Sequence, residues 1–522
     1  MSHSKLFFPA ILVIFWFAMI CIVNPMGNFP LNDDWQYARP VFNLINNGHY
    51  LASDNFSPVI VAQVFWGTLF CLPGGFSFNA LRLSTLVLSF VGILVFYFIL
   101  LKVSKNRRIS FLCALLLAAN PLYIVSANSF MTEVPFITIS FISIYFFICA
   151  AESDKPKYII MATVFAVIAT LIRQFGIVIP LAYGIVSIFS NKPKLIQWWR
   201  YMLPSLIAVV ALELTLMWLK HIGSELRPYG GSTLADFLSK PFNIVRSGVF
   251  RSCYMLYYAG FFLLPLLLFT TARALKGLSR RGKIGILIVT GLYAWALVMR
   301  WDRLPYGNVI NEYGIGAQLL RGMNEVIDPD FPHALLVTLK TIGFLGAILL
   351  VINFCRAIIE IIKGYRTKDD TTKPWFMQAF IIVFFVGYGV LIFVPDFFFD
   401  RYLLPLIPLS AMVVLMGMSE NNTLKSYSFV TICSIAVVLG ITSSVMTHDY
   451  VRWNEARWQA ADYLNKQLNI SPYKVDGGYE YNGWMIGNPR NDTPKNKHRS
   501  NMYVEDDEYV IAVRDLDDYA VI

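Results

Sequence analysis

Residues 6–24 read LFFPAILVIFWFAMICIVN, and residues 25–38 continue as PMGNFPLNDDWQYA. The first stretch is long enough to cross a bilayer, because about 20 mainly apolar residues span the hydrocarbon core. We interpret it as a retained helix, since it is longer than the apolar part of a usual signal peptide and no A-x-A cleavage site follows it. The second stretch turns polar at once and carries two adjacent carboxylates, Asp33 and Asp34.

Similar apolar runs recur along the whole chain. Of its 522 residues, 57% are hydrophobic and 15% are charged, whereas soluble domains carry roughly 25% charged residues. The composition predicts an all-α polytopic membrane protein and excludes a soluble enzyme, a disordered chain and a disulfide-rich secreted module. A transmembrane β-barrel is not expected, because the runs do not alternate in ten-residue segments. Thirteen segments are expected to span the membrane: residues 6–24, 80–101, 109–126, 135–151, 158–173, 175–190, 202–220, 253–272, 284–300, 335–355, 376–394, 402–418 and 428–446.

The placement of basic residues predicts the orientation in the membrane. The N-terminus and the loops on its side carry 21 of the 43 lysine and arginine residues. Basic loops resist translocation, so this side is expected to be cytoplasmic. Thirteen crossings would then put the C-terminus on the extracytoplasmic side.

Two domains are expected, a transmembrane domain over residues 1–446 and a small extracytoplasmic α/β domain over residues 447–522. In the second, residues 450–468 have the pattern of an amphipathic helix and residues 509–513 that of a strand. In the first outer loop, residues 36–48 and 57–70 are too short or too polar to span and predict interfacial helices. There, Trp35, Tyr37 and Trp66 would suit the aromatic belt at the membrane surface.

The adjacent carboxylates Asp33 and Asp34 allow two interpretations. Asp favours the N-cap position, so Asp33 can simply cap a helix that begins near Gln36. Alternatively, the pair supplies a general base or a ligand at the membrane surface.

Glu133 is isolated in the stretch SANSFMTEVP at residues 126–135 and falls at the outer end of a helical hairpin. It can cap the next helix together with Thr132 and Pro135. A functional role is the alternative, because an ionisable group at membrane depth is costly unless it has a partner or a use.

Two arginines interrupt apolar runs at the same predicted depth. Arg173 can be a side chain that snorkels at a hairpin tip, and Arg401 can form a local ion pair with Asp400 or Asp396. Functionally, guanidinium groups bind phosphate oxygens with two parallel hydrogen bonds, so two arginines at one depth suit a phosphate.

Glu213 lies within a predicted span, where a buried carboxyl that faces other helices is the default expectation. A proton-coupling role for Glu213 would instead favour a transporter.

Four short motifs, in this order along the chain, resemble those of polytopic GT-C glycosyltransferases that use polyprenyl-phosphate-linked sugars. The closest likeness is to the protein O-mannosyltransferase and lipid A aminoarabinose transferase group. The motifs are DDWQYA at residues 33–38, NALRL at 79–83, NP at 120–121 with MTEVP at 131–135, and RYLLPLIP at 401–408. The sequence departs from the group at residue 133, where Asp is commoner than Glu, and in its smaller tail.

The resemblance implies a GT-C-like fold and sugar transfer on the extracytoplasmic side, with inversion at the anomeric carbon. Asp33 would be the general base, with Asp34 and Glu133 orienting it or the acceptor. Arg173, Arg401 and Tyr402 would bind the donor phosphate, and Tyr37 and Trp35 would orient donor or acceptor.

The implied partners are a polyprenyl-phosphate sugar, a glycan, lipid or protein acceptor and membrane lipids, but no nucleic acid. The resemblance implies no certain cofactor and allows a divalent cation between acid and phosphate. The expected location is a bacterial inner membrane.

Two other classes remain open at this point. A multi-pass transporter or lipid flippase would explain the many helices and Glu213, although such proteins place their binding sites near the bilayer midplane. A polysaccharide ligase or polymerase would also use a lipid-linked donor.

Overall fold

The structure is a computed structural model. It describes residues 3–522 except 53–56, 154, 192–197, 225, 227–238, 240, 276–277, 306, 312–313, 317–318, 322–324, 327–331, 368–373, 394–397, 417–424, 488–503, 505–506, 513–515 and 517–518.

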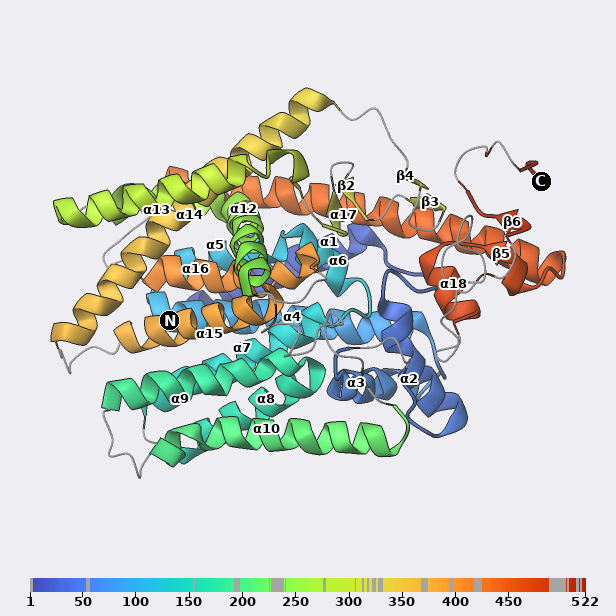
Figure 1. Ribbon diagram of the computed structural model, residues 1–522, viewed down its shortest axis with the longest axis horizontal. Helices are drawn as coiled ribbons and strands as arrows, with labels where there is room; N and C mark the ends of the chain where they lie inside the picture. The colour runs from blue at the N-terminus through green and yellow to red at the C-terminus, as the bar shows by residue number, and fades with distance from the viewer. Residues whose placement is uncertain are drawn as a thin grey trace.

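The described residues are mainly helical, and most helices run roughly along the long axis of the molecule (Figure 1). The α-helices are α1 (His3–Val23), α2 (Asp34–Asn47), α3 (Val61–Cys71), α4 (Phe78–Ser104), α5 (Arg107–Ala118), α6 (Pro121–Ala127), α7 (Glu133–Glu152), α8 (Pro156–Ile172), α9 (Val178–Asn191), α10 (Trp198–His221), α12 (Pro241–Ala274), α13 (Arg280–Val298), α14 (His333–Thr367), α15 (Pro374–Phe393), α16 (Leu406–Met416), α17 (Ser426–Asp462) and α18 (Tyr479–Met485).

Short elements complete the architecture. The 3₁₀ turns are η1 (Gln174–Ile177), η4 (Trp301–Arg303), η5 (Asp400–Leu403) and η7 (Pro472–Lys474), and η6 (Tyr463–Gln467) is a π-helical turn. The strands are β1 (Ile310–Asn311), β2 (Gly314–Ile315), β3 (Leu319–Arg321), β4 (Glu325–Val326), β5 (Val475–Asp476) and β6 (Tyr509–Val510). Strands β1 and β2 form an antiparallel pair, as do β3 and β4, whereas β5 and β6 pair in parallel.

Local sequence signals account for where the early helices begin. The side chain of Ser77 accepts a hydrogen bond from the Asn79 amide at the start of α4, and that of Asn106 accepts bonds from the first turn of α5. Asn120 caps α6, whose first residue is Pro121. These side chains satisfy amide groups that have no partner within the helix.

Within the described residues, nine helices are long and apolar enough to cross a membrane, or ten if α5 and α6, which meet at a 61° bend, count as one span. The other predicted spans are helical but short: α8 has 17 residues, α9 has 14 and α16 has 11. The predicted count of thirteen spans is therefore not confirmed. The predicted class, an all-α polytopic membrane protein, is confirmed.

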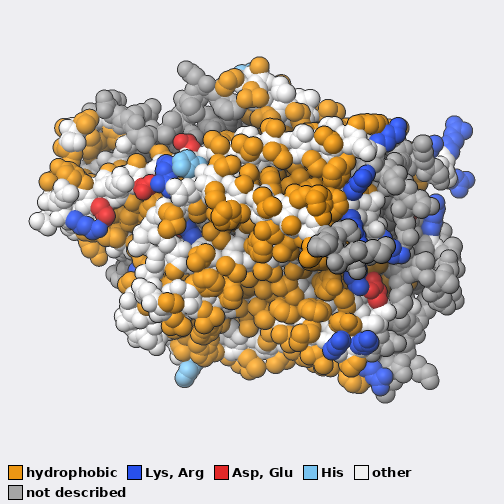
Figure 2. Space-filling view, turned by 180° about the vertical axis from the view of Figure 1, so that it is seen from behind, with side chains coloured by type: hydrophobic (Ala, Val, Ile, Leu, Met, Phe, Trp, Pro, Cys, Tyr) orange, Lys and Arg blue, Asp and Glu red, His pale blue; other side chains and the backbone are white. Residues whose placement is uncertain are grey.

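The surface has the form expected of an integral membrane protein. Hydrophobic side chains cover the middle of the molecule, while charged side chains gather toward its ends (Figure 2). Lys and Arg side chains lie at the right-hand end of that view, which is the end where Figure 1 marks the N-terminus. Large apolar side chains that are exposed on the helices include Phe17, Leu214, Leu287, Trp295 and Val386.

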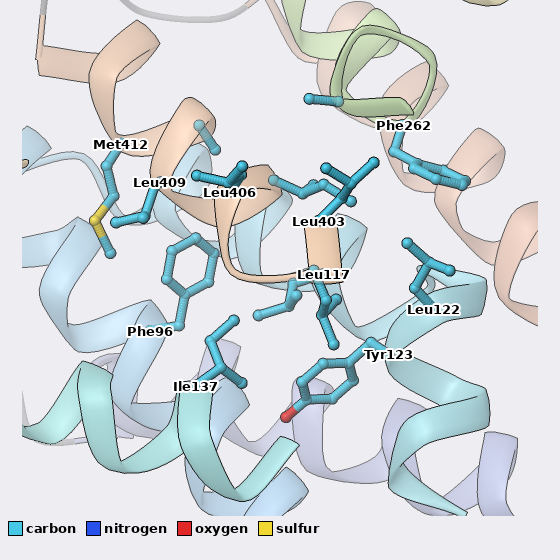
Figure 3. Close-up of a cluster of buried hydrophobic side chains, with 14 of the residues drawn as sticks. Phe96, Leu117, Leu122, Tyr123, Ile137, Phe262, Leu403, Leu406, Leu409 and Met412 are labelled. Carbon is cyan, nitrogen blue, oxygen red and sulfur yellow. The ribbon is translucent and has the colours of Figure 1, made fainter. Parts of the chain in front are cut away.

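A buried apolar cluster connects the early and late parts of the chain (Figure 3). Phe96 from α4 and Leu117 from α5 lie near Leu403 from η5 and Leu406 from α16. Lipid tails are as apolar as these side chains, so close packing rather than exclusion of water holds such helices together. This packing fixes the position of η5, the element that contains Arg401.

Two glycines allow α12 and α14 to pack closely. A β-carbon on Gly260 of α12 or on Gly346 of α14 would come within 2.3 Å and 2.2 Å, respectively, of the opposite backbone. Small residues of this kind let membrane helices pack backbone to backbone.

The tail grows directly out of the last span. Helix α17 continues from the membrane part into the predicted amphipathic segment and ends at Asp462, without a break at residue 446. Beyond it, β5, α18 and β6 form the small α/β unit, and α18 packs against α2. Figure 1 shows α2, α3 and α18 at the end of the molecule opposite the N-terminus. The division into two domains at residue 446 stays a prediction.

The first outer loop contains the two predicted short helices, α2 and α3. The prediction that Trp35 and Tyr37 belong to an interfacial aromatic belt is wrong, because both side chains are buried inside the protein. Helix α18 covers Trp35, which packs edge to face against Tyr479.

Candidate active site

Four predicted site residues meet in one cluster, although the chain supplies them from four separate elements. Asp33 precedes α2, Glu133 is the first residue of α7, Arg173 links α8 to η1, and Arg401 lies in η5. We call Asp33, Glu133, Arg173 and Arg401 the charged cluster. Its two carboxylates and two guanidinium groups balance in formal charge.

Asp33 stands at the N-cap position of α2 but makes no capping hydrogen bond with its side chain. Instead, its Oδ2 accepts a hydrogen bond from Arg401 Nη2, and its Oδ1 accepts one of 2.7 Å from the Tyr479 hydroxyl. The preceding Asn32 adopts a left-handed conformation with φ of 55°, which Asn tolerates better than most residues. The capping interpretation is therefore wrong for the side chain of Asp33.

Glu133 is fully buried and lies between the two arginines. Its Oε1 is 2.6 Å from Arg173 Nη2 and 3.3 Å from Arg401 Nε. The carboxylate also lies in the first turn of α7, where the helix dipole favours negative charge. These contacts explain how an acid can remain at this depth.

Arg173 does not snorkel, because its side chain is only 1% exposed. Its Nε donates a 2.7 Å hydrogen bond to Thr132 Oγ1, and its guanidinium carbon lies 5.1 Å from the centre of the Tyr402 ring. Arg173 thus binds both Thr132 and Glu133 at the start of α7.

Arg401 connects the two carboxylates of the charged cluster. Burial alone would lower the pKa of Arg401, but the negative charges of Asp33 and Glu133 outweigh it and raise that pKa well above its usual value. Its guanidinium group lies 4.8 Å from the centre of the Phe399 ring and 5.5 Å from that of Tyr402. Within the described part of the chain, the buried Nη1 of Arg401 has no hydrogen-bond partner.

Asp400 has a different role from the predicted local ion pair. Its carboxylate accepts backbone hydrogen bonds from Asn308, Val309 and Ile310, the last at 2.7 Å, and from the amide of Arg401 at 2.9 Å. Burial raises the pKa of Asp400 to about 6 even though these bonds lower it. Asp400 therefore joins η5 to the β1–β2 hairpin. Asp396, the other predicted partner, lies outside the described residues.

Asp34 faces backbone amides instead of Arg173 and Arg401. Its Oδ1 accepts a 2.6 Å hydrogen bond from the Leu31 amide, and its Oδ2 accepts one of 3.3 Å from the Phe130 amide. The side chain is fully buried, and burial raises its pKa to about 8. Asp34 thus ties the first outer loop to the turn before Glu133.

Two aromatic residues with predicted roles lie beside the charged cluster. Tyr37 is buried, and burial, followed by the negative charge of Asp33, raises its pKa well above the usual value. The Tyr402 ring packs against both arginines, and its carbonyl accepts a 3.1 Å hydrogen bond from Tyr388.

Tyr479 is the site residue that sequence reasoning missed. Besides donating to Asp33, its hydroxyl accepts a 2.8 Å hydrogen bond from Gln36 Nε2. Nothing in the sequence around Tyr479 distinguishes it from the other tyrosines of the chain.

A divalent cation between an acid and the donor phosphate stays a prediction. Within the described residues, no three His, Cys, Asp or Glu side chains gather closely enough to hold a metal ion. The two carboxylates of the charged cluster are instead bridged by Arg401.

A small pocket lies beside Arg401. It is lined by Asn32, Asn128, Ser129 and Tyr450, among others, and has room for about one water molecule.

Glu213 does not face other helices, as the sequence had suggested, but is exposed on the surface of α10. The prediction of a buried carboxyl at this position is wrong.

Comparisons with known proteins agree with the motif resemblance over part of the chain. A family model described as dolichyl-phosphate-mannose-protein mannosyltransferase matches residues 57–219. The chain is thus similar to that family over this segment, as predicted. No curated protein sequence matches the chain.

Among solved structures, ArnT from Cupriavidus metallidurans in the apo state is 13% identical, with 92% of this chain and 83% of that chain covered and a TM-score of 0.41. The same protein bound to undecaprenyl phosphate is also 13% identical, with 88% and 80% covered and a TM-score of 0.40. The arabinosyltransferase EmbB from Mycobacterium smegmatis is 13% identical, with 84% and 42% covered and a TM-score of 0.32. These TM-scores are too low to support an argument about this chain.

Proposed function

We propose that this protein is a membrane glycosyltransferase that moves a sugar from a polyprenyl phosphate to an acceptor hydroxyl on the extracytoplasmic side. The observation that carries the proposal is the charged cluster. In it, the partly exposed carboxylate of Asp33 pairs with Arg401, whose Nη1 has no hydrogen-bond partner among the described residues. The similarity of residues 57–219 to a family named for a lipid-phosphate sugar donor supports the same reaction.

In the proposed reaction, Asp33 is the general base. Its side chain is 20% exposed, whereas Glu133, Arg173 and Arg401 are at most 1% exposed. Asp33 therefore offers the route by which an acceptor hydroxyl can reach the site. As the acceptor oxygen attacks the anomeric carbon, its proton passes to Asp33, and a positioned base of this kind is worth about 10²–10⁴-fold in rate.

Arg401 would stabilise the departing phosphate. The bond between the anomeric carbon and the phosphate oxygen breaks, and its electron pair leaves with the polyprenyl phosphate. Arg401 Nη1 is the donor available for this growing negative charge. Attack from the face opposite the phosphate inverts the anomeric configuration.

The remaining residues keep these two groups in place. Glu133 and Arg173 form a buried ion pair that fixes one side of Arg401. Tyr402 packs under both arginines, and Asp34 positions the loop that carries Asp33. No step uses a metal ion.

The membrane orientation remains part of the proposal. The charged cluster lies with α2, α3 and α18 at the end of the molecule opposite the N-terminus. A cytoplasmic N-terminus, which the basic loops predict, puts this end on the extracytoplasmic side of a bacterial inner membrane.

The position of Glu213 no longer favours the alternative of a transporter or lipid flippase. A coupling carboxyl has to face a pathway through the protein, and Glu213 is exposed on the outside of α10.

The test is sugar transfer by Asp33→Asn in lipid nanodiscs. The donors are radiolabelled undecaprenyl-phosphate hexoses and pentoses, and an extract of bacterial envelope provides acceptors. We expect the variant to lose at least about 100-fold of the wild-type rate. The matched control is Asp449→Asn, an exposed aspartate of α17, which should transfer at the wild-type rate. A folded Asp33→Asn protein with near-normal transfer would refute the base assignment.

A further inference from the structure

Helix α18 brings a side chain from the far end of the chain to the charged cluster. Its first residue, Tyr479, is 446 positions away from Asp33 in sequence. The helix begins after Gly478, which has φ of 86°, and the Asn482 side chain bonds to Asp476 and to the Gly477 amide. These bonds make α18 an ordered part of the site.

Further contacts hold α18 on the first outer loop. Glu480 accepts a hydrogen bond from the Asn32 amide at 3.1 Å and forms an ion pair with Arg457 at 2.6 Å. Trp484 packs among Phe42, Phe76 and Phe78, and Arg39 lies over its ring. Helix α18 is therefore held against the loop that carries Asp33.

The Tyr479 hydroxyl has the hydrogen bonds that an acceptor hydroxyl needs. It donates to Asp33 Oδ1 at 2.7 Å and accepts from Gln36 Nε2 at 2.8 Å. A general base takes a proton from a group that donates to it at about 2.6–3.2 Å. Burial, together with the charge of Asp33, raises the pKa of Tyr479 well above its usual value, so the phenol keeps its proton.

We propose that Tyr479 occupies the acceptor-hydroxyl subsite, formed by Asp33 Oδ1 and Gln36 Nε2, and that the acceptor displaces it. The inference rests on the proposed function and deepens it. An alcohol both donates and accepts hydrogen bonds, whereas a lysine ammonium group has donors only and an amide nitrogen does not accept. The subsite therefore selects alcohols, and α18 controls their access.

The exposure of the neighbouring residues marks the route of entry. Four neighbouring residues are partly exposed: Asn32, Asp33, Gln36 and Tyr479. The other three members of the charged cluster, Glu133, Arg173 and Arg401, are buried. An acceptor that arrives from the aqueous side can therefore reach these four residues.

Water, the smallest hydroxyl compound, is the probe for this subsite. The assay measures free sugar released from the undecaprenyl-phosphate sugar that the wild type uses, with the full chain in nanodiscs and no other acceptor. Tyr479→Phe removes only the hydroxyl and leaves room for water between Asp33 and Gln36. We expect hydrolysis to become about tenfold faster, since the variant removes a competing hydrogen bond to a charged group. The double variant with Asp33→Asn should lose this gain.

The control is Tyr481→Phe, the same change on the same helix. The Tyr481 hydroxyl bonds to Asn465 and lies outside the site, so hydrolysis should stay at the wild-type rate. A second variant, Gly483→Ala, keeps the Tyr479 hydroxyl but would place a β-carbon 2.4 Å from the Trp35 ring and so push α18 outward. It should also speed hydrolysis.

Each outcome decides one claim. If Tyr479→Phe hydrolyses the donor no faster than wild type, or more slowly, Tyr479 does not occupy the acceptor subsite. Wild-type transfer that depends on Asp33 leaves the proposed function intact in that case. Absence of any transfer by the wild type would overturn the proposed function itself.

Discussion

Glu133→Gln tests whether the charged cluster holds the outer ends of the helices together. The wild-type carboxylate is fully buried and lies 2.6 Å from Arg173 and 3.3 Å from Arg401. The substitution keeps the size and one acceptor oxygen of the side chain but removes its charge. Asp33, which binds Arg401, is then the one carboxylate left in the charged cluster beside two buried guanidinium groups.

The magnitude follows from these contacts. Removing one partner of a buried ion pair costs about 3–5 kcal/mol, because the other charge is left without compensation. The glutamine oxygen still accepts a hydrogen bond from a charged donor, which is worth about 1.5–3 kcal/mol. We therefore expect Glu133→Gln to lower the free energy of unfolding by about 2 kcal/mol.

The assay is reversible unfolding in mixed micelles titrated with SDS. The matched control is Glu360→Gln in α14, where the ion pair with Arg356 has a similar distance of 2.7 Å but the glutamate is 30% exposed. That control should lose at most about 0.5 kcal/mol. The double variant Glu133→Gln/Arg173→Gln should lose less than the sum of the two single variants, because it removes opposite charges together. If Glu133→Gln is no worse than Glu360→Gln, the buried pair does not stabilise the fold.

Two further predictions concern the aspartates outside the charged cluster. Asp400→Ala removes the acceptor of three loop amides, so hydrogen exchange at residues 308–310 should become at least about tenfold faster by mass spectrometry; unchanged exchange there would contradict the anchoring role. Burial raises the pKa of Asp34 from its ordinary value of 3.8 to about 8 in the folded chain, so the folded state holds an extra proton between these values and stability should fall as the pH rises toward 8. From pH 6.5 to 7.5, the free energy of unfolding should fall by close to about 1.4 kcal/mol per pH unit, and by less in Asp34→Asn. Equal slopes in the two proteins would show that Asp34 does not titrate in this range.

The charged cluster was predictable because depth in a membrane can be inferred from sequence. The ends of apolar helices fall at one of two surfaces, so Asp33, Glu133, Arg173 and Arg401 were expected on one face although Asp33 and Arg401 are 368 positions apart. Depth alone does not say which ends are neighbours. That information comes from packing, such as the apolar core around Leu403.

The direction of individual side chains was not predictable. Asp33 and Asp34 are adjacent, yet Asp33 binds Arg401 and Asp34 accepts hydrogen bonds from two backbone amides. Trp35 and Tyr37 are of the residue types that favour a membrane interface, but both side chains are buried inside the protein. Short helices such as α16 also made the number of spans impossible to count from hydropathy.

The position of Tyr479 depends on a contact between the two ends of the chain. The sequence of α18 has no periodicity or motif that predicts its contact with the first outer loop. Only the folded arrangement brings Tyr479 to Asp33.

The unbroken course of α17 has a mechanical consequence. Its 37 residues correspond to a rod of about 55 Å, well beyond the ~30 Å thickness of a hydrocarbon core. Near its outer end, Arg457 bonds to Glu480, which in turn bonds to the first loop. A continuous helix, not a flexible linker, therefore supports α18. The length of α17 sets the distance of α18 from the bilayer, and a tilt of α17 would change that distance.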